Sequence, residues 1–145
     1  MWLVEDGREG SWLTMAVLLS YHGNDESDAA LRAAIRLTEM MRSSLVVLVA
    51  ARTGADDDRT VTNAHERLWG RLEGTDIPFQ VLNAPAGHTI SQAVLDTAAE
   101  IEPDVIVLGL RIGGSRVTTL GANAQRVLLD APCPVLTTTQ FILDA

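Results

Sequence analysis

The chain has 145 residues, of which 47% are hydrophobic and 21% are charged, and this composition fits one soluble globular domain with a proper core. Its formal net charge of −8 argues against binding to nucleic acids or to anionic membranes, because both attract clustered positive charge. All 11 basic residues are arginine, which excludes any chemistry that depends on a lysine, such as a Walker-type phosphate contact or a Schiff base.

Buried-looking strands alternate with amphipathic helices along the chain. In chain order the sequence predicts strands and helices in alternation: strand 15–21, helix 27–42, strand 45–50, helix 60–72, strand 77–82, helix 89–102, strand 105–108, helix 122–129 and strand 134–139. Ser27 or Asp25 stands where a helix cap is expected. Strands that are apolar throughout and separated by helices predict a parallel sheet covered on both faces, so the expected fold is a doubly wound, three-layer α/β/α sandwich.

The predicted domain spans residues 15–145, and residues 1–14 stand outside it. That segment has no strong periodicity, and the first strand begins directly at Met15. We expect either translation from Met15 or a poorly ordered, loosely docked extension, on which Trp2 and Trp12 are the large apolar groups.

Three predicted strand ends converge on one edge of this sheet. His22 and Gly23 follow the first strand, Ala50 and Ala51 come at the end of the second, and the glycine loop after Gly109 follows the fourth. Ligands of doubly wound sheets bind beyond the carboxyl ends of the strands, where the winding direction reverses. The sequence therefore predicts one cleft lined by these three strand ends.

A glycine-bearing segment follows the strand Asp104-Val-Ile-Val-Leu-Gly109. It contains Gly113, Gly114 and Ser115 and leads to Gly121 at the start of a helix. Glycines between a strand end and a helix start let backbone N–H groups converge on an anion such as phosphate.

The closing run Gln-Arg-Val-Leu-Leu-Asp-Ala-Pro-Cys-Pro-Val-Leu, residues 125–136, is the most specific motif of the chain. Together with the preceding strand and the order of elements, it resembles the universal stress protein family over about residues 15–139. The resemblance implies a sheet in the order three-two-one-four-five. It also implies a homodimer in which the fifth strand pairs across the axis, and the candidate interface residues are Val135, Leu136, Thr137 and Thr138.

ATP-binding members of that family carry Gly-x-x-Gly, nine residues, and then Gly-Ser or Gly-Thr. Gly109 and Gly121 match the first and last glycines, but the loop is one residue short. Ile112 stands at the second glycine, Ala122 at the phosphate-binding hydroxyl, and His22 at an aspartate that contacts the nucleotide. Loss of the hydroxyl alone removes about 1.5–3 kcal/mol of hydrogen bonding to an anion.

Other groups of the same segment are able to replace these contacts. Arg111 and Arg116 offer guanidinium groups to phosphate, and Ser115 offers a hydroxyl. The resemblance thus implies the following candidate nucleotide-binding residues: His22, Val49, Gly109, Arg111, Gly113, Gly114, Ser115, Arg116, Gly121, Ala122 and Asn123.

Two functions follow from these features. The first is a non-enzymatic, stress-related regulatory homodimer with a degenerate nucleotide-binding loop and no tight ATP binding. The alternative is an ATP- or AMP-binding switch that uses the remodelled loop from Gly109 to Gly121. A metabolic enzyme is disfavoured because the predicted site lacks a nucleophile–base pair, and a phosphoacceptor receiver would need a lysine.

The remaining polar groups are given structural interpretations. His22, His65 and His88 are not at metal-ligand spacing, and the carboxylates at 56–58 fit a solvated loop, so no metal site is expected. The single cysteine, Cys133, precludes an intrachain disulfide, fits a reducing cytoplasm, and is expected to be an inert core thiol. No run of 18 apolar residues predicts a membrane span.

Overall fold

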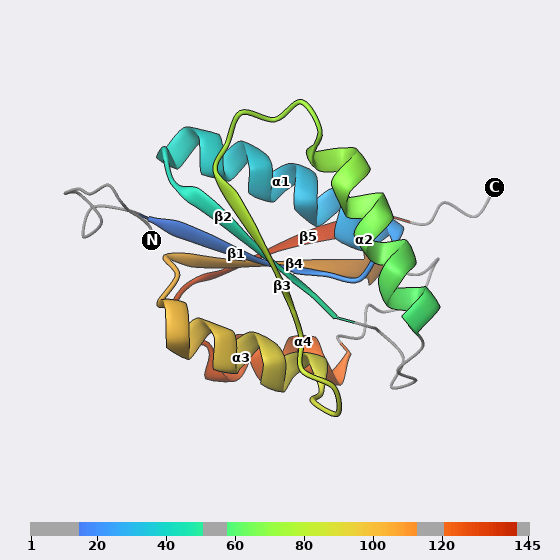
Figure 1. Cartoon of the computed structure of the whole chain (residues 1–145). Coiled ribbons are helices and arrows are strands. Elements are labelled where there is room, and N and C mark those ends of the chain that lie inside the picture. Colours follow the sequence, from blue (N-terminus) through green and yellow to red (C-terminus); the bar gives the residue numbers. More distant parts are fainter. Residues whose placement is uncertain (1–14, 51–57, 113–120, 142–145) are drawn as a thin grey trace.

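The computed structural model describes residues 15–50, 58–112 and 121–141. Strands and helices alternate along these segments as the sequence predicts (Figure 1). In chain order they are β1 (Ala16–Tyr21), α1 (Asp25–Met41), β2 (Ser44–Val49), α2 (Asp58–Leu72), β3 (Phe79–Asn83), α3 (Ile90–Ile101), β4 (Val105–Ile112), α4 (Ala122–Asp130) and β5 (Val135–Phe141). Residues 1–14, for which an extension was predicted, lie outside the described ranges.

The five strands form one parallel sheet in the order β3-β2-β1-β4-β5. This confirms the predicted order. The chain winds outward from β1 to β2 and β3, returns to β4 on the other side of β1, and ends at β5. The winding direction therefore reverses between β1 and β4, and β3 and β5 are the two edges of the sheet.

The helices cover the two faces of the sheet in pairs, so the molecule has three layers (Figure 1). α1 and α2 pack on the face to which Val17, Leu19 and Tyr21 of β1 point. α3 and α4 pack on the opposite face, where Leu18 is buried. This alternation along one strand is the two-residue period of β structure, and it divides the core into two apolar clusters.

α1 begins at Asp25 and its cap is Asn24, one residue before Asp25 and three before Ser27. The Asn24 side chain accepts a hydrogen bond from the backbone N–H of Ser27 at 3.0 Å, while the Ser27 hydroxyl accepts one from the Asn24 backbone N–H at 3.1 Å. The prediction of Ser27 or Asp25 as the cap was therefore wrong. Ser27 is instead the second member of a reciprocal capping box, and Asp25 is the first helical residue.

β4 is longer than predicted, because it continues through Ile112. Its last residues pair with β5, with Leu110 opposite Thr139 and Ile112 opposite Phe141. Gly109 therefore lies inside the strand, and the interpretation of residues 110–112 as part of a loop was wrong. A longer β5 supplies the hydrogen-bonding partner that keeps these residues extended.

Candidate functional site

The carboxyl ends of β1 and β4 mark the point where the winding direction reverses, and three of the predicted site residues lie near it. His22 follows β1, Gly109 lies in β4, and Gly121 caps α4. In open α/β sheets this crevice is the usual place for a ligand. What the site can bind depends on the groups that these residues leave available.

The His22 ring bridges the ends of two neighbouring strands. Its Nδ1 lies 3.0 Å from the backbone carbonyl oxygen of Ala50, just after β2, and its Nε2 lies 3.2 Å from the hydroxyl oxygen of Ser20. A carbonyl oxygen only accepts hydrogen bonds, so Nδ1 carries the proton and, in the neutral ring, Nε2 accepts from Ser20. Both ring nitrogens are thus engaged by the protein itself.

Ser20 and His22 form a hydroxyl–imidazole pair that sequence reasoning missed. In a hydrolase such a pair would be a nucleophile and its base. Here Ser20 is only 1% exposed, because it lies within β1 beneath α3 and α4, so its hydroxyl is sealed from substrates. The pair fixes the orientation of the ring and has no catalytic geometry.

Gly109 is required by packing. A Cβ built on it would overlap the backbone carbonyl oxygen of Glu26 and lie 2.7 Å from the carbonyl carbon. The first turn of α1 therefore rests directly on β4, and a side chain at this position would push the two elements apart. This role needs no bound phosphate.

The start of α4 carries the groups that remain open at the site. Gly121 supplies no side-chain cap, and both it and Ala122 are exposed. The side-chain oxygen of Asn123 accepts a hydrogen bond from the backbone N–H of Ser91 at 3.0 Å and so joins the first turns of α4 and α3. Asn123 is accordingly a structural link between the two helices.

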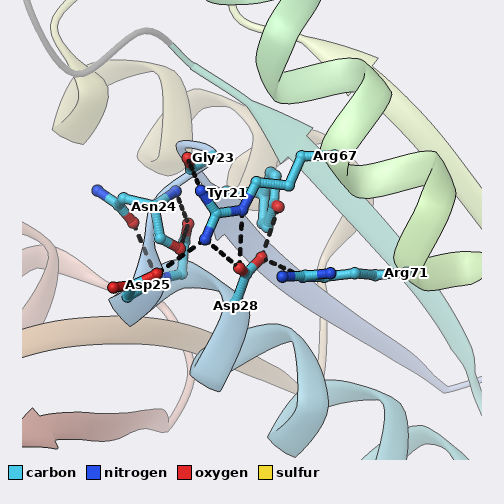
Figure 2. A network of polar contacts seen from close by, with 8 residues as sticks. Tyr21, Gly23, Asn24, Asp25, Asp28, Arg67 and Arg71 are labelled. Carbon is cyan, nitrogen blue, oxygen red and sulfur yellow. Dashed lines mark hydrogen bonds and ion pairs between the residues drawn. The ribbon is translucent and has the colours of Figure 1, made fainter.

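A buried polar cluster lies on the other face of the sheet, where β1, α1 and α2 meet (Figure 2). Its centre is Asp28, which is 3% exposed. The Asp28 carboxylate accepts hydrogen bonds from the hydroxyl of Tyr21 at 2.7 Å and from Nε of Arg67 at 2.8 Å, and it pairs with Nε of Arg71 at 2.9 Å. We call these four residues the polar clamp.

Charge and burial oppose each other in the polar clamp. Burial by itself raises the pKa of Asp28, but the hydrogen bonds from Tyr21, Arg67 and Arg71 outweigh it and leave this pKa below its usual value. Burial, and then the bond to Asp28, raises the pKa of the Tyr21 hydroxyl. Asp28 is thus ionised at neutral pH, and Tyr21 keeps its proton.

The polar clamp was not predicted from the sequence, although two signals for it are present. Asp28 occupies a position on the apolar stripe of α1, three residues before Leu31. Arg67 and Arg71 are spaced by four residues, which places both on one side of α2. A carboxylate on a buried stripe and two arginines on the neighbouring helix indicate a buried ion pair.

The remaining predicted residues are not gathered into one pocket. The Val49 side chain is buried in the core beneath α1 and α2, and its backbone carbonyl accepts from the N–H of Ala84. Arg111 lies in β4. Gly113, Gly114, Ser115 and Arg116 lie outside the described residues.

The predicted interface residues lie on β5, the edge strand. Val135 packs against the core under α3 and α4, whereas Leu136 is 41% exposed. Thr137 and Thr138 are half-buried. The edge thus presents an apolar side chain beside unpaired backbone groups.

Cys133 and His65 have structural surroundings, whereas the carboxylates at 56 and 57 lie outside the described residues. The Cys133 thiol is half-buried, and burial followed by the nearby Asp104 carboxylate raises its pKa. His65 is hydrogen-bonded to the Asn83 side chain across α2 and β3. In the part of the chain that the structure describes, no group of three or more His, Cys, Asp or Glu residues is arranged to hold a metal ion. The described helices are also too short or too polar to cross a membrane.

Comparisons with known proteins agree with this architecture. The model of the universal stress protein family matches residues 83–138, which include β4, α4 and the closing run. A universal stress protein of Mycobacterium tuberculosis is 25% identical over 143 residues, covering 86% of this chain and 48% of the relative.

The chain is similar in sequence to the universal stress protein family over residues 83–138 and shares the fold of its solved members.

Solved structures of universal stress proteins share its fold. One from Archaeoglobus fulgidus superposes with a TM-score of 0.68 at 20% identity, covering 85% of this chain and 92% of the other. Another from Archaeoglobus fulgidus, in complex with dAMP, gives a TM-score of 0.65 at 20% identity, with 86% and 96% covered. The chain spans about half the length of the curated relatives that it matches, 48% of each.

Proposed function

We propose that this chain is a universal stress protein that acts as a non-enzymatic, stress-related regulatory homodimer of the cytoplasm and whose nucleotide site is degenerate. The observation that carries the proposal is the His22 ring. It stands at the end of β1 with one nitrogen on the Ala50 carbonyl and the other on the Ser20 hydroxyl, so neither is available to a ligand. A ligand that enters here must break these bonds without gaining equivalent ones.

The neighbouring groups support the same proposal. Gly109 is explained by its contact with α1, and Ala122 brings no hydroxyl to the first turn of α4. The Asn123 side chain is engaged by Ser91. Among the described residues around the crevice, the backbone N–H groups of α4 are therefore the groups that remain to bind an anion.

A regulatory role without catalysis is supported by the burial of Ser20. Among the described residues of the crevice, the hydroxyl–imidazole pair of Ser20 and His22 is sealed inside the sheet. The role would then depend on contacts with other proteins or with a second copy of the chain.

The homodimer is supported by the sheet edge. β5 is an edge strand with an exposed leucine, Leu136. A second copy pairing at β5 satisfies the open backbone groups of the edge.

An adenine-nucleotide switch is the second candidate. It is favoured by the Archaeoglobus fulgidus neighbour, which was solved in complex with dAMP, and by the start of α4, where Gly121 leaves the first-turn N–H groups without a side-chain cap.

The two candidates are separated by nucleotide binding. The purified protein is denatured and analysed for released nucleotide by mass spectrometry, and the emptied protein is titrated with AMP and with Mg-ATP by calorimetry. The proposed function predicts no co-purified nucleotide and no binding at micromolar concentrations. The matched variant His22→Asp with Ala122→Ser is expected to bind at least tenfold more tightly than the wild type. Micromolar binding by the wild type would favour the switch.

A further inference from the structure

The turn that follows β1 is held from outside the sheet by α2. Gly23 has a φ of +76°, and a Cβ built on it would lie 2.9 Å from the Cβ of Ala64. The turn thus presses directly against α2 at a residue with the smallest side chain that α2 offers there. Close backbone approach of this kind leaves the turn little freedom to move.

Arg67 adds a directed contact to this packing. Its Nη1 donates to the backbone carbonyl of Gly23 at 3.1 Å, while its Nη2 donates to Asp25 at 2.9 Å (Figure 2). Its Nε meanwhile donates to Asp28. One guanidinium therefore joins the turn, the first helical residue of α1 and the centre of the polar clamp.

Arg71 lacks two of the described contacts that Arg67 makes, those to Gly23 and to Asp25. It also pairs with Asp28, from the other side of the carboxylate, but no bond joins it to the turn (Figure 2). The side chains of the two arginines are similarly accessible, at 34% and 45% exposed. Two arginines of α2 thus pair with the same carboxylate, and Arg67 is the one that also reaches Gly23.

We propose that Arg67 is the positioning residue of the His22 turn. By holding the Gly23 carbonyl, it keeps the preceding residue, His22, with its ring on the Ala50 carbonyl at the end of β1. α2 thereby controls how the crevice between β1 and β4 presents itself to a ligand. This inference rests on the proposed function for its meaning, but its test does not require a ligand.

The test compares Arg67→Met with Arg71→Met in the full chain. Both variants remove an ion pair to Asp28, and only the first also releases Gly23 and Asp25. The readout is the proportion of the Nδ1–H tautomer of His22, measured from the ring ¹⁵N chemical shifts at about pH 8.5, which is well above the ordinary histidine pKa of about 6.5. A role confined to stability would leave this tautomer unchanged.

We expect the wild type and Arg71→Met to hold the Nδ1–H tautomer, and Arg67→Met to show a mixture of both. Exchange of the Asn24 amide, which is bonded to Ser27, is expected to become at least tenfold faster in Arg67→Met relative to Arg71→Met. Equal behaviour of the two variants, changed or unchanged, would overturn the role of Arg67.

Two controls keep the result interpretable. If Arg67→Met does not fold, Arg67→Lys keeps the charge beside Asp28, and because a single ammonium cannot span Asp28 and Gly23 together, the same change at His22 is expected. AMP is titrated into the wild type in the same series. Micromolar binding there would overturn the degenerate site and leave the Arg67 inference standing. An unchanged His22 tautomer in Arg67→Met would overturn the Arg67 inference and leave the degenerate site standing.

Discussion

Gly109 and Gly121 are the two glycines that the sequence matches to a nucleotide-binding motif, but they have different surroundings. A side chain on Gly109 meets the backbone of α1, whereas nothing lies within 4 Å of a Cβ built on Gly121. We expect Gly109→Ala to lower the free energy of unfolding by about 3 kcal/mol or more. Gly121→Ala, at a helix cap, is expected to cost less than about 1 kcal/mol.

Urea denaturation followed by circular dichroism measures both glycine variants. The comparison is internal, because the substitution is the same and only the surroundings differ. Small and equal losses would mean that α1 shifts away from β4 without penalty, contrary to the packing role of Gly109.

Asp28 gives stability a dependence on pH. Its pKa in the folded protein lies below that of the unfolded chain, so on acidification the unfolded state takes up the proton first. The stabilisation is complete above the ordinary aspartate pKa of about 3.9 and is lost as the pH falls from there through the folded pKa. At pH 7 we expect Asp28→Asn to cost about 2–3 kcal/mol.

The measurement is the difference in unfolding free energy between wild type and Asp28→Asn at several pH values. This difference should shrink below about pH 4, since the wild type then loses the charge that the variant lacks. Asp25→Asn is the matched control. Asp25 pairs with the same Arg67 but is 69% exposed, so a cost below about 1 kcal/mol is expected. A difference that stays constant with pH would contradict the assignment.

At the scale of elements, α1 ends in a strained residue. Its C-cap, Arg42, has a φ of 53°, in the left-handed region that favours glycine. Arg42→Gly is expected to raise the free energy of unfolding by about 0.5–1 kcal/mol, because relief of this strain exceeds the entropy that glycine loses. Arg36→Gly, within the same helix and also exposed, should lower it by about 1 kcal/mol.

The two arginine variants differ only in position, and thermal unfolding reports both. Opposite signs are expected. A loss of stability in Arg42→Gly would show that contacts of the arginine side chain outweigh the backbone strain.

The elements were predictable from sequence because most of them carry one clear period. Buried strands such as 45–50 are apolar throughout, and the helices repeat apolar residues on one side. Boundaries were harder, because they depend on partners distant in sequence. Residues 110–112 join β4 only because β5 continues beside them. The Gly109 contact and the polar clamp both join residues of different elements. Which elements pack together is decided by the helices docking on the sheet, and sequence periodicity does not specify those pairings.

The candidate site was predictable as a place and not as a set of contacts. Topology alone located the ends of β1 and β4. The use of both His22 nitrogens depends on Ala50, which lies 28 residues further along the chain. No local sequence pattern around His22 predicts that the Ala50 carbonyl is its partner.

At the scale of the whole molecule, the proposed homodimer depends on the β5 edge. Leu136→Asp should convert it to a monomer, because a carboxylate buried in an apolar interface loses its hydration without gaining a partner. Met40→Asp is the control, since Met40 is 73% exposed and belongs to α1, not to β5. Light scattering coupled to size-exclusion chromatography measures the mass. A monomeric wild type, or an equal effect of the two variants, would contradict the proposal.

The contact between Gly109 and the first turn of α1 also limits how the protein can change shape. Side chains at an interface adjust by rotating, but two backbones in direct contact have no such freedom. α1 and β4 therefore form a rigid unit, and β1 lies beside β4 in the sheet. We therefore expect any conformational change in this molecule to carry α1 and β4 together and to move other elements against them.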